Sequence, residues 1–298
     1  MKNKYLSISL LLFVLYITYL PASASAIRID TLSMPIKTSN RLLQPINIAI
    51  SADGTWKLFV EALNNQIINQ DHPNYFIPLS RVELSELNGS PIAQFNTGKV
   101  IEVFAPSPTA INNMNLSLNL LSSDCDRAGD YSLDIKFTLV DGNSNTSDYV
   151  YTFRFNKEEI SSIDFTEKAV NLRLDRNKTL AKNASQNLNT PLGIYVSSNK
   201  DWKLFVRKSS SNDEANIKTF VKTLGGDSSI SCNTTNEYIS INDNPILLAS
   251  GKATINNYSN LLDKKLINID YMVRGPKDKF IPAGSYNEEL EYLLQTED

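Results

Sequence analysis

Histidine is nearly absent from the sequence, which argues against most mechanisms that depend on proton transfer by a side chain. The single histidine among 298 residues is His72, in the stretch NQDHPNY. A Ser-His-Asp or Cys-His mechanism needs a histidine that takes and returns a proton beside a nucleophile. No G-x-S-x-G motif lies near His72, and a polar stretch ahead of Pro73 is typical of a surface loop. We therefore expect no catalytic residue.

Cysteine is also scarce, which argues against a structural zinc site. Cys125 and Cys232 are far apart in the sequence, and one histidine does not complete a tetrahedral ligand set with them. A phosphate-binding loop is lacking too, because LGGDSS at 224–229 has no lysine and no helical pattern after it. We expect no metal and no cofactor. Two alternatives stay open for the cysteines: a disulfide between them, or two separate thiols.

Two loops rich in acidic and amide side chains are the remaining places for chemistry. They are DCDRAGD, with Asp124, Asp126 and Asp130, and DGNSNTSD, with Asp141, Asn143, Asn145 and Asp148. Oxygen-rich loops bind calcium in some proteins, but neither loop has the EF-hand spacing. Nothing in the sequence pairs two carboxylates across a cleft, as a glycosidase requires. We interpret both loops as solvated turns.

An excess of basic charge is missing. The chain has 29 Lys and Arg against 32 Asp and Glu, a formal net charge of −3. Removal of residues 1–26 takes away Lys2 and Lys4 and leaves 27 minus 32, or −5. A mildly acidic chain gives no electrostatic reason to expect a nucleic-acid partner.

Long apolar runs are lacking after residue 26. Before it, Lys2 and Lys4 precede an apolar stretch from Leu6 to Leu20, and Ala24-Ser25-Ala26 fits the small-x-small cleavage rule. This layout predicts a signal peptide over 1–26, cleaved near Ala26. The alternative, an uncleaved anchor, is disfavoured because the stretch is shorter than the ~20 residues that span a bilayer. We expect no transmembrane segment in the mature chain, and a secreted, periplasmic or cell-surface location.

Tryptophan occurs only twice, and both times within the same five letters. WKLFV is found at 56–60 and again at 202–206. A second pair of similar stretches closes each half: RAGDYSLDIKFTLV at 127–140 and PAGSYNEELEYLLQ at 282–295. Two motifs that recur in the same order at nearly the same offset indicate an internal duplication. We therefore predict two repeated domains, 27–157 and 158–298.

Apolar and polar residues alternate within these motifs, as they do in β-strands with one buried face. No convincing helical stripe occurs after residue 26, and turn signals are frequent. The predicted fold is all-β: two tandem Ig-like antiparallel β-sandwiches after the signal peptide. The predicted structural core comprises Trp56, Trp202, Leu58, Leu204, Val60, Val206, Gly129, Gly284, Tyr131 and Tyr286.

At GTWKLFV and AGDYSLDIKFTLV the chain resembles bacterial exported β-sandwich modules, namely WxL-like, spore-coat-U-like and fimbrial pilin-like domains. These families share an early Trp- or apolar-rich strand and a closing strand after an Ala-Gly-x-Tyr motif. The resemblance implies a surface or fimbrial setting and supplies no catalytic residues.

The resulting functional hypothesis is an exported, non-enzymatic structural or adhesion protein. Its partner would be a protein or glycan at the cell envelope. One alternative is a fimbrial subunit, pilin-like or at the tip, assembled by strand donation, with the segment 27–40 as the donor strand. Another alternative is a carbohydrate-active enzyme, which would need two carboxylates facing each other in a groove.

Overall fold

The computed structural model covers most of the chain beyond residue 24. The described residues are 25–33, 35–37, 41–52, 54–104, 113–167, 169–170, 185–187, 190–209, 217–255, 262–276 and 286–297. The predicted signal peptide, except for Ser25 and Ala26, lies outside them. Within this part of the chain no helix is both long and apolar enough to cross a bilayer.

The described residues are almost entirely strands and turns, with one short 3-10 helix, η1 (Leu79–Arg81). The strands up to residue 157 are β1 (Ala26–Thr31), β2 (Ile36–Lys37), β3 (Arg41–Ser51), β4 (Trp56–Ala62), β5 (Gln66–Asn69), β6 (Phe76–Pro78), β7 (Val82–Glu86), β8 (Pro91–Gln94), β9 (Ile101–Phe104), β10 (Asn113–Leu121), β11 (Gly129–Asp141) and β12 (Thr146–Lys157). The later strands are β13 (Ser161–Phe165), β14 (Ser185–Asn187), β15 (Leu192–Ser198), β16 (Asp201–Lys208), β17 (Lys218–Gly226), β18 (Ile230–Cys232), β19 (Ile239–Ser240), β20 (Ile246–Gly251), β21 (Lys265–Arg274) and β22 (Leu290–Glu297).

The chain forms two compact units, each with its own hydrophobic core. Unit 1 comprises the residues up to Ile68, Phe76–Ser122 and Tyr131–Phe155, and unit 2 comprises Asn69–Tyr75, Ser123–Asp130 and the residues from Asn156 onward. The main part of unit 2 thus begins next to the predicted domain boundary at residue 157. Two short segments that the prediction assigned to the first domain, Asn69–Tyr75 and Ser123–Asp130, also belong to unit 2.

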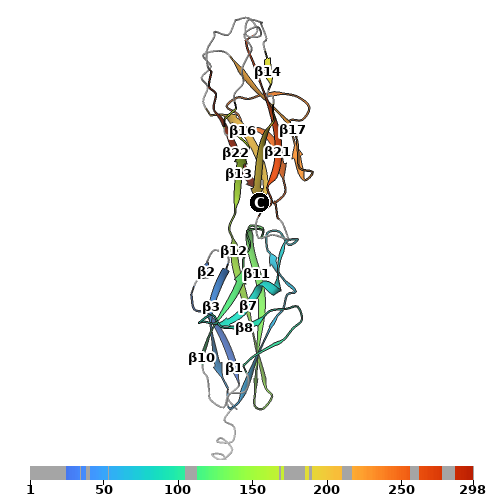
Figure 1. Ribbon diagram of the computed structural model, residues 1–298. Coiled ribbons are helices and arrows are strands. Elements are labelled where there is room, and N and C mark those ends of the chain that lie inside the picture. Colours follow the sequence, from blue (N-terminus) through green and yellow to red (C-terminus); the bar gives the residue numbers. More distant parts are fainter. Residues whose placement is uncertain are drawn as a thin grey trace, which may run out of the picture. The chain divides into compact units, whose positions relative to one another are not determined.

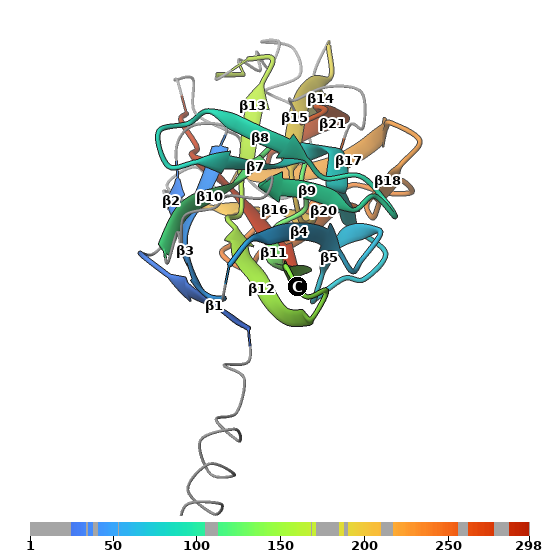
Figure 2. The same cartoon turned by 90° about the horizontal axis from the view of Figure 1, so that it is seen from below.

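Unit 1 is a sandwich of two antiparallel sheets. One has the strand order β1-β3-β10-β7-β8, with β2 also paired to β3. The other has the order β6-β5-β11-β4-β9, with β12 also paired to β11. In immunoglobulin notation, β1, β3, β10 and β7 are strands A, B, E and D, and β4, β11 and β12 are strands C, F and G. Figures 1 and 2 show β11 and β12 side by side.

Over its described residues, unit 2 repeats this plan with fewer strands in its second sheet. Its first sheet has the order β13-β15-β21-β17-β19, with β14 also paired to β21, which again gives strands A, B, E and D. Its second sheet has the order β18-β20-β16-β22, in which β16 and β22 are strands C and F. Strands β13, β16, β21 and β22 can be followed in Figure 1.

Strict alternation along the central strands explains why two sheets can pack face to face. In β11 the inward side chains of Tyr131, Leu133, Ile135, Phe137 and Leu139 are at most 2% exposed. The residues between them are half-buried or exposed. A strand with one apolar side must cover that side against another layer, and the facing sheet supplies the layer.

Both tryptophans lie in the cores, as predicted from the alternation. Trp56 is 2% exposed and Trp202 is 1% exposed. Trp202 lies opposite Gly251 of the neighbouring strand β20, and a Cβ added to Gly251 would lie 2.5 Å from Cζ2 of the indole. The indole ring therefore occupies the space that a side chain at residue 251 would need. The residues two and four positions after each tryptophan, which share its face of the strand, are all 0% exposed: Leu58, Val60, Leu204 and Val206.

In the fimbrial alternative the segment 27–40 is a donor strand for another subunit, but the first part of this segment has a different role in the structure. Its first part is β1, which pairs with β3 of the same chain along its whole length. Ile27 and Ile29 are 8% and 3% exposed and belong to the core of unit 1. The prediction was wrong because the alternating residues that suit a donor strand complete the sandwich of their own chain instead.

Candidate functional site

Strands C and F pair in the same register in both units, which allows a residue-by-residue comparison. The pairs are Trp56–Asp141, Leu58–Leu139 and Val60–Phe137 in unit 1, and Trp202–Thr296, Leu204–Leu294 and Val206–Tyr292 in unit 2. These are the pairs obtained when the two WKLFV motifs and the two Ala-Gly-x-Tyr motifs are superposed. Differences in burial between β11 and β22 therefore reflect what covers each strand.

In unit 1 the strand β12 pairs with β11 and covers the edge of β11 that β4 does not occupy. Phe153 of β12 is 0% exposed, and Phe155 packs against the core. The Phe155 ring stacks on Tyr131 of β11, with ring centroids 5.2 Å apart and planes 4° from parallel. Strand G thus seals the closing strand of this sandwich with aromatic side chains.

In unit 2 the corresponding side of β22 is less well covered. Among the described residues β22 pairs with β16 only. Its inward side chains Leu290, Tyr292 and Leu294 pack against the core of unit 2 but are only partly buried. The β11 residues at the same register are 0% exposed. The difference is what the loss of a neighbouring strand G would produce.

The edge strand of the facing sheet in unit 2 lies on the same side of the sandwich. The rings of Phe165 in β13 and Tyr292 in β22 meet edge to face, with centroids 5.0 Å apart. Ile163 of β13 is also partly buried and packs against the same core. We call β22 together with Ile163 and Phe165 the open edge. It is a stripe of half-covered apolar side chains between two edge strands.

The inner side of the open edge is uncharged. The hydroxyl groups of Tyr271 and Tyr292 are hydrogen-bonded to each other. Burial raises the pKa of Tyr292 to about 12, and burial together with the neighbouring Tyr292 raises the pKa of Tyr271 well above its usual value. Both phenols therefore stay protonated at neutral pH.

The face of β22 that points away from the core carries charged side chains. Glu291 accepts a hydrogen bond from Nε of Arg207 at 2.7 Å, and Glu297 forms an ion pair with Lys203. Both pairs join β22 to β16, and all four side chains are partly exposed. The two faces of β22 are thus chemically distinct, so a strand that adds to this edge would have one apolar and one polar face.

The glycine and the tyrosine of the Ala-Gly-x-Tyr motif were predicted to be structural core residues in both halves of the chain. Gly129 has φ +130°, and an added Cβ would lie 2.7 Å from Oδ2 of Asp71, so the position requires glycine. Tyr131 is 2% exposed, but Tyr286 is 44% exposed and does not belong to the core. The prediction for Tyr286 was wrong because β22 begins only at Leu290, so the tyrosine precedes the strand. Gly284 lies outside the described residues.

The two cysteines are not joined by a disulfide. Both belong to unit 2, where Cys125 is buried and Cys232 is half-buried. Burial raises the pKa of the Cys232 thiol, which keeps it protonated and poorly reactive. The structure corresponds to the alternative with two separate thiols.

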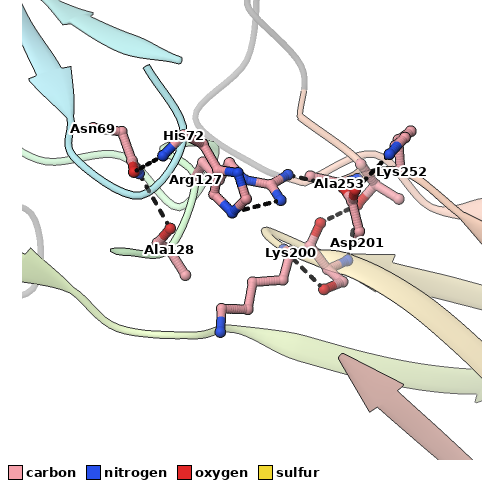
Figure 3. A network of polar contacts seen from close by, with 10 residues as sticks. Asn69, His72, Arg127, Ala128, Lys200, Asp201, Lys252 and Ala253 are labelled. Atoms are coloured by element: carbon pink, nitrogen blue, oxygen red, sulfur yellow. Dashed lines mark hydrogen bonds and ion pairs between the residues drawn. The ribbon is translucent and has the colours of Figure 1, made fainter. Parts of the chain in front are cut away.

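A buried arginine organises one end of unit 2, in the segments that the first half contributes (Figure 3). Nη1 of Arg127 donates to Oδ1 of Asp201 at 2.8 Å, and the Arg127 side chain is 1% exposed. Its guanidinium lies over the Tyr75 ring, 4.6 Å from the centroid, and Nη2 is 3.2 Å from Nε2 of His72. His72 thus contacts a structural cation and does not lie beside a nucleophile.

Asp201 balances this buried charge. It also accepts hydrogen bonds from Nζ of Lys252 at 2.8 Å and from the backbone N–H of Ala253 at 3.0 Å. Burial alone would raise the pKa of Asp201, but the hydrogen bonds from Arg127, Lys252 and Ala253 outweigh it and lower the pKa to about 2. Asp201 is therefore ionised at neutral pH, and its contacts position the surrounding loops. No local sequence pattern predicts this cluster, because Arg127 lies in a stretch with the composition of an acidic turn.

The acidic loops are occupied by turn hydrogen bonds. Oδ1 of Asp141 accepts the backbone N–H groups of Asn143 and Asn145 at 2.9 and 2.8 Å. Asp126 accepts the N–H of Ser123, and Asp130 accepts from the Asn156 amide. Within the described ranges no group of three or more His, Cys, Asp and Glu side chains is arranged to hold a metal ion.

No family model matches the sequence, and a search of curated proteins finds no match. Among solved structures, the chain is similar to one in the chaperone–tip adhesion subunit pre-assembly complex of the archaic chaperone-usher Csu pili of Acinetobacter baumannii. The identity is 12% and the TM-score 0.35, over 90% of this chain and 91% of that chain. A chaperone–tip adhesin complex of CFA/I fimbriae matches at 11% identity and a TM-score of 0.30, over 92% of both chains. A family 123 glycoside hydrolase from Clostridium perfringens matches at 12% identity and 0.27, over 44% of this chain and 27% of that chain. Likenesses of this strength assign no activity or partner.

Proposed function

We propose that the protein is an exported, non-enzymatic surface protein of fimbrial type, and that its unit 2 is completed by an extended strand from another polypeptide. The observation that carries the proposal is the partial exposure of Leu290, Tyr292 and Leu294, at a register where unit 1 has fully buried residues. The partner strand would lie along β22 in the place that β12 takes in unit 1.

The physical argument is that of an edge strand with an unfinished core. Free backbone N–H and C=O groups along an edge pair readily with another extended chain. Covering the half-exposed apolar side chains of the open edge adds roughly 25 cal/mol for each Å² removed from water. Both contributions favour a strand whose alternate residues point between β13 and β22.

Unit 1 supplies a template for the chemistry of that strand. Phe153 and Phe155 of β12, two residues apart, are the inward side chains that seal β11. A partner strand for unit 2 should likewise carry large apolar residues at every second position. The equal registers of the two sandwiches also support the interpretation that both arose by duplication of one ancestral unit.

The enzymatic alternative has less support. The carboxylates of Asp126, Asp130 and Asp141 accept hydrogen bonds from loop and turn groups, and His72 contacts Arg127. These groups stabilise local structure and are not arranged as an acid and a base on two sides of a cleft.

A peptide with the β12 sequence tests the proposal directly. The mature chain is titrated with a synthetic peptide of residues 147–156, SDYVYTFRFN, and binding is followed by calorimetry while thermal unfolding is recorded. We expect saturable binding of one peptide and a rise in the unfolding temperature of unit 2, because a ligand that binds only the folded state stabilises it. A scrambled peptide of the same composition should do neither.

Two variants on opposite faces of β22 provide the matched comparison. Leu294→Ser changes an inward, partly buried residue, and Gln295→Ser changes its exposed neighbour. The first should weaken peptide binding by about tenfold or more, and the second should leave it unchanged. Absence of saturable binding, or equal binding of the scrambled peptide, would overturn the proposal. Circular dichroism of both variants establishes that they are folded.

A further inference from the structure

A small cleft lies at one edge of the second sheet of unit 1, where β4 and β5 are separated by residues 63–65. Its volume is about 210 Å³. The cleft is lined by Asn65, Gln66, Phe76, Pro78, Leu79, Ser80, Asn96 and Thr97, and we call it the edge cleft. All of these residues belong to unit 1, so the edge cleft is independent of the open edge.

Pairing of β6 with β5 presents the wall of the edge cleft to solvent. Phe76 lies opposite Ile68, and Pro78 lies opposite Gln66. Ile77, between Phe76 and Pro78, is 1% exposed and anchors β6 in the core, so its two neighbours must point outward. Phe76 is 52% exposed, so part of its aromatic side chain is open to solvent at the cleft.

Hydrogen bonds fix the opposite wall, which is the stretch that precedes β9. Phe95 is fully buried, and its N–H donates to the carbonyl of Val82 at 3.0 Å. The hydroxyl of Thr97 donates to the carbonyl of Asn65 at 3.3 Å, and the Gln94 amide donates to the carbonyl of Ser80. The cleft is thus held open by contacts beneath and beside it, and a ligand would meet a largely preformed surface.

Among the described residues, the lining has no charged side chain. Arg81 follows Ser80 in the sequence, but its Nε donates to the carbonyl of Leu121 at 2.7 Å and Arg81 is not part of the lining. The side-chain amides of Asn65 and Gln66 have no hydrogen-bond partner among the described residues, so their donors and acceptors remain for a ligand. The combination is one aromatic face with several neutral donors and acceptors.

We propose that the edge cleft binds a neutral carbohydrate, with one sugar ring stacked on Phe76. The negative face of an aromatic ring attracts the partly positive C–H groups of a pyranose, and amide side chains bind its hydroxyls in either direction. A charged glycan or an acidic peptide would find no counter-ion in the cleft. The volume is below the ~300–1,000 Å³ typical of sites for drug-sized ligands, so the cleft accommodates a terminal sugar.

The test uses the mature chain and a printed array of neutral, sialylated and sulfated oligosaccharides. Neutral glycans that bind are then titrated in solution as free saccharides, with chemical shifts of the Asn and Gln side-chain amides as the readout. We expect binding of a subset of neutral glycans that share a terminal sugar, with the amide signals of Asn65 and Gln66 shifting on titration.

Two substitutions at Phe76 and one remote control separate binding from folding. Phe76→Tyr keeps the ring and should keep binding, whereas Phe76→Ala should weaken it about tenfold or more. Val150→Ala removes apolar surface from another exposed residue of unit 1, 50% exposed, and should leave binding unchanged. The proposal fails if no neutral glycan binds, if Phe76→Ala binds as well as the unaltered chain, or if only charged glycans bind. Strand addition at unit 2 would be untouched by any of these results.

Discussion

Gly251 shows how one residue of unit 2 depends on another. Its α-carbon faces the indole of Trp202, and an added methyl group would approach Cζ2 to 2.5 Å and Cε2 to 2.7 Å. Atoms do not approach that closely, so either the ring or the strand β20 must move. Glycine is therefore required here by packing against the indole.

Gly251→Ala should accordingly lower the free energy of unfolding of unit 2 by about 1–3 kcal/mol, the usual range for overpacked cores. Urea titration followed by circular dichroism measures the change, since the comparison below removes the tryptophan of unit 2. In a Trp202→Leu background the smaller side chain leaves room, so the added methyl should cost less there than in the unaltered chain. Equal costs in both backgrounds would show that the strain does not involve the indole.

Asp201 makes part of the stability of unit 2 dependent on pH. Its folded-state pKa is about 2, below the usual value of 3.8. A group with a lowered folded-state pKa stabilises the protein fully above its unfolded pKa, and this stabilisation is lost as the pH falls toward the folded value. The relevant window is therefore about pH 4 down to about pH 2.

The expected outcome is a difference between Asp201→Asn and the unaltered chain that is large at pH 7 and narrows between about pH 4 and pH 2. The variant is less stable at neutral pH because the buried Arg127 loses its 2.8 Å ion pair with Asp201. Urea titrations over this pH range measure both chains. Asp164→Asn, which removes an exposed ion pair with Lys264, should have little effect at any pH. A constant difference across the range would contradict the assigned role of Asp201.

Some residues were predictable from the sequence and others were not. The buried positions of Trp56 and Trp202 follow from alternation within WKLFV, because Leu and Val two and four residues later share the same face. The burial of Arg127 does not follow, because its partner Asp201 is 74 positions away and a charged residue in a polar loop normally faces water. The exposure of Phe76 was missed because a short strand between polar loops has too few residues to show a period.

At the scale of strands, the prediction succeeded where one pattern runs for many residues. The long strands β10, β11, β16 and β21 lie close to the ranges that alternation predicts for them, namely 114–121, 129–140, 201–208 and 264–273. β3 runs from Arg41 to Ser51 and contains Pro45, which has no N–H to donate to a ladder hydrogen bond. In the structure β1 ends at Thr31, opposite Ile46, so the nitrogen of Pro45 needs no ladder hydrogen bond there.

The closing strands β11 and β22 begin at different points after the Ala-Gly-x-Tyr motif. β11 has apolar residues at five successive inward positions from Tyr131. When the two Ala-Gly-x-Tyr motifs are superposed, the second half has Glu288 at the position that corresponds to Leu133. Glu288 forms an ion pair with Lys208, and the regular strand starts at Leu290. Alternation after the Ala-Gly-x-Tyr motif predicts a strand over 284–295, whereas β22 covers Leu290–Glu297, because a carboxylate cannot occupy a core position without a strong partner.

At the scale of the whole molecule, the recurrence of two sequence motifs made the architecture predictable, and the difference between the two units is informative. Repeated motifs specify strands C and F in both halves, and the Asp-Gly turn after β11 indicated strand G in the first. A sequence cannot show how much of an apolar face stays uncovered, because burial depends on neighbours that are distant along the chain. That quantity came only from comparing β22 with β11 at equal register.

Hydrogen exchange offers the corresponding test on the whole chain without any ligand. Alternate amides of an edge strand point away from its single neighbour, so they exchange through local openings or directly with water. In β22 the amides directed away from β16 should exchange faster than those directed toward it, while in β11, with neighbours on both sides, both sets should be equally slow. β16, which lies between β20 and β22, serves as the internal control for unit 2. Uniformly slow exchange along β22 would mean that its outer side is already paired, and unit 2 would then need no strand from another chain.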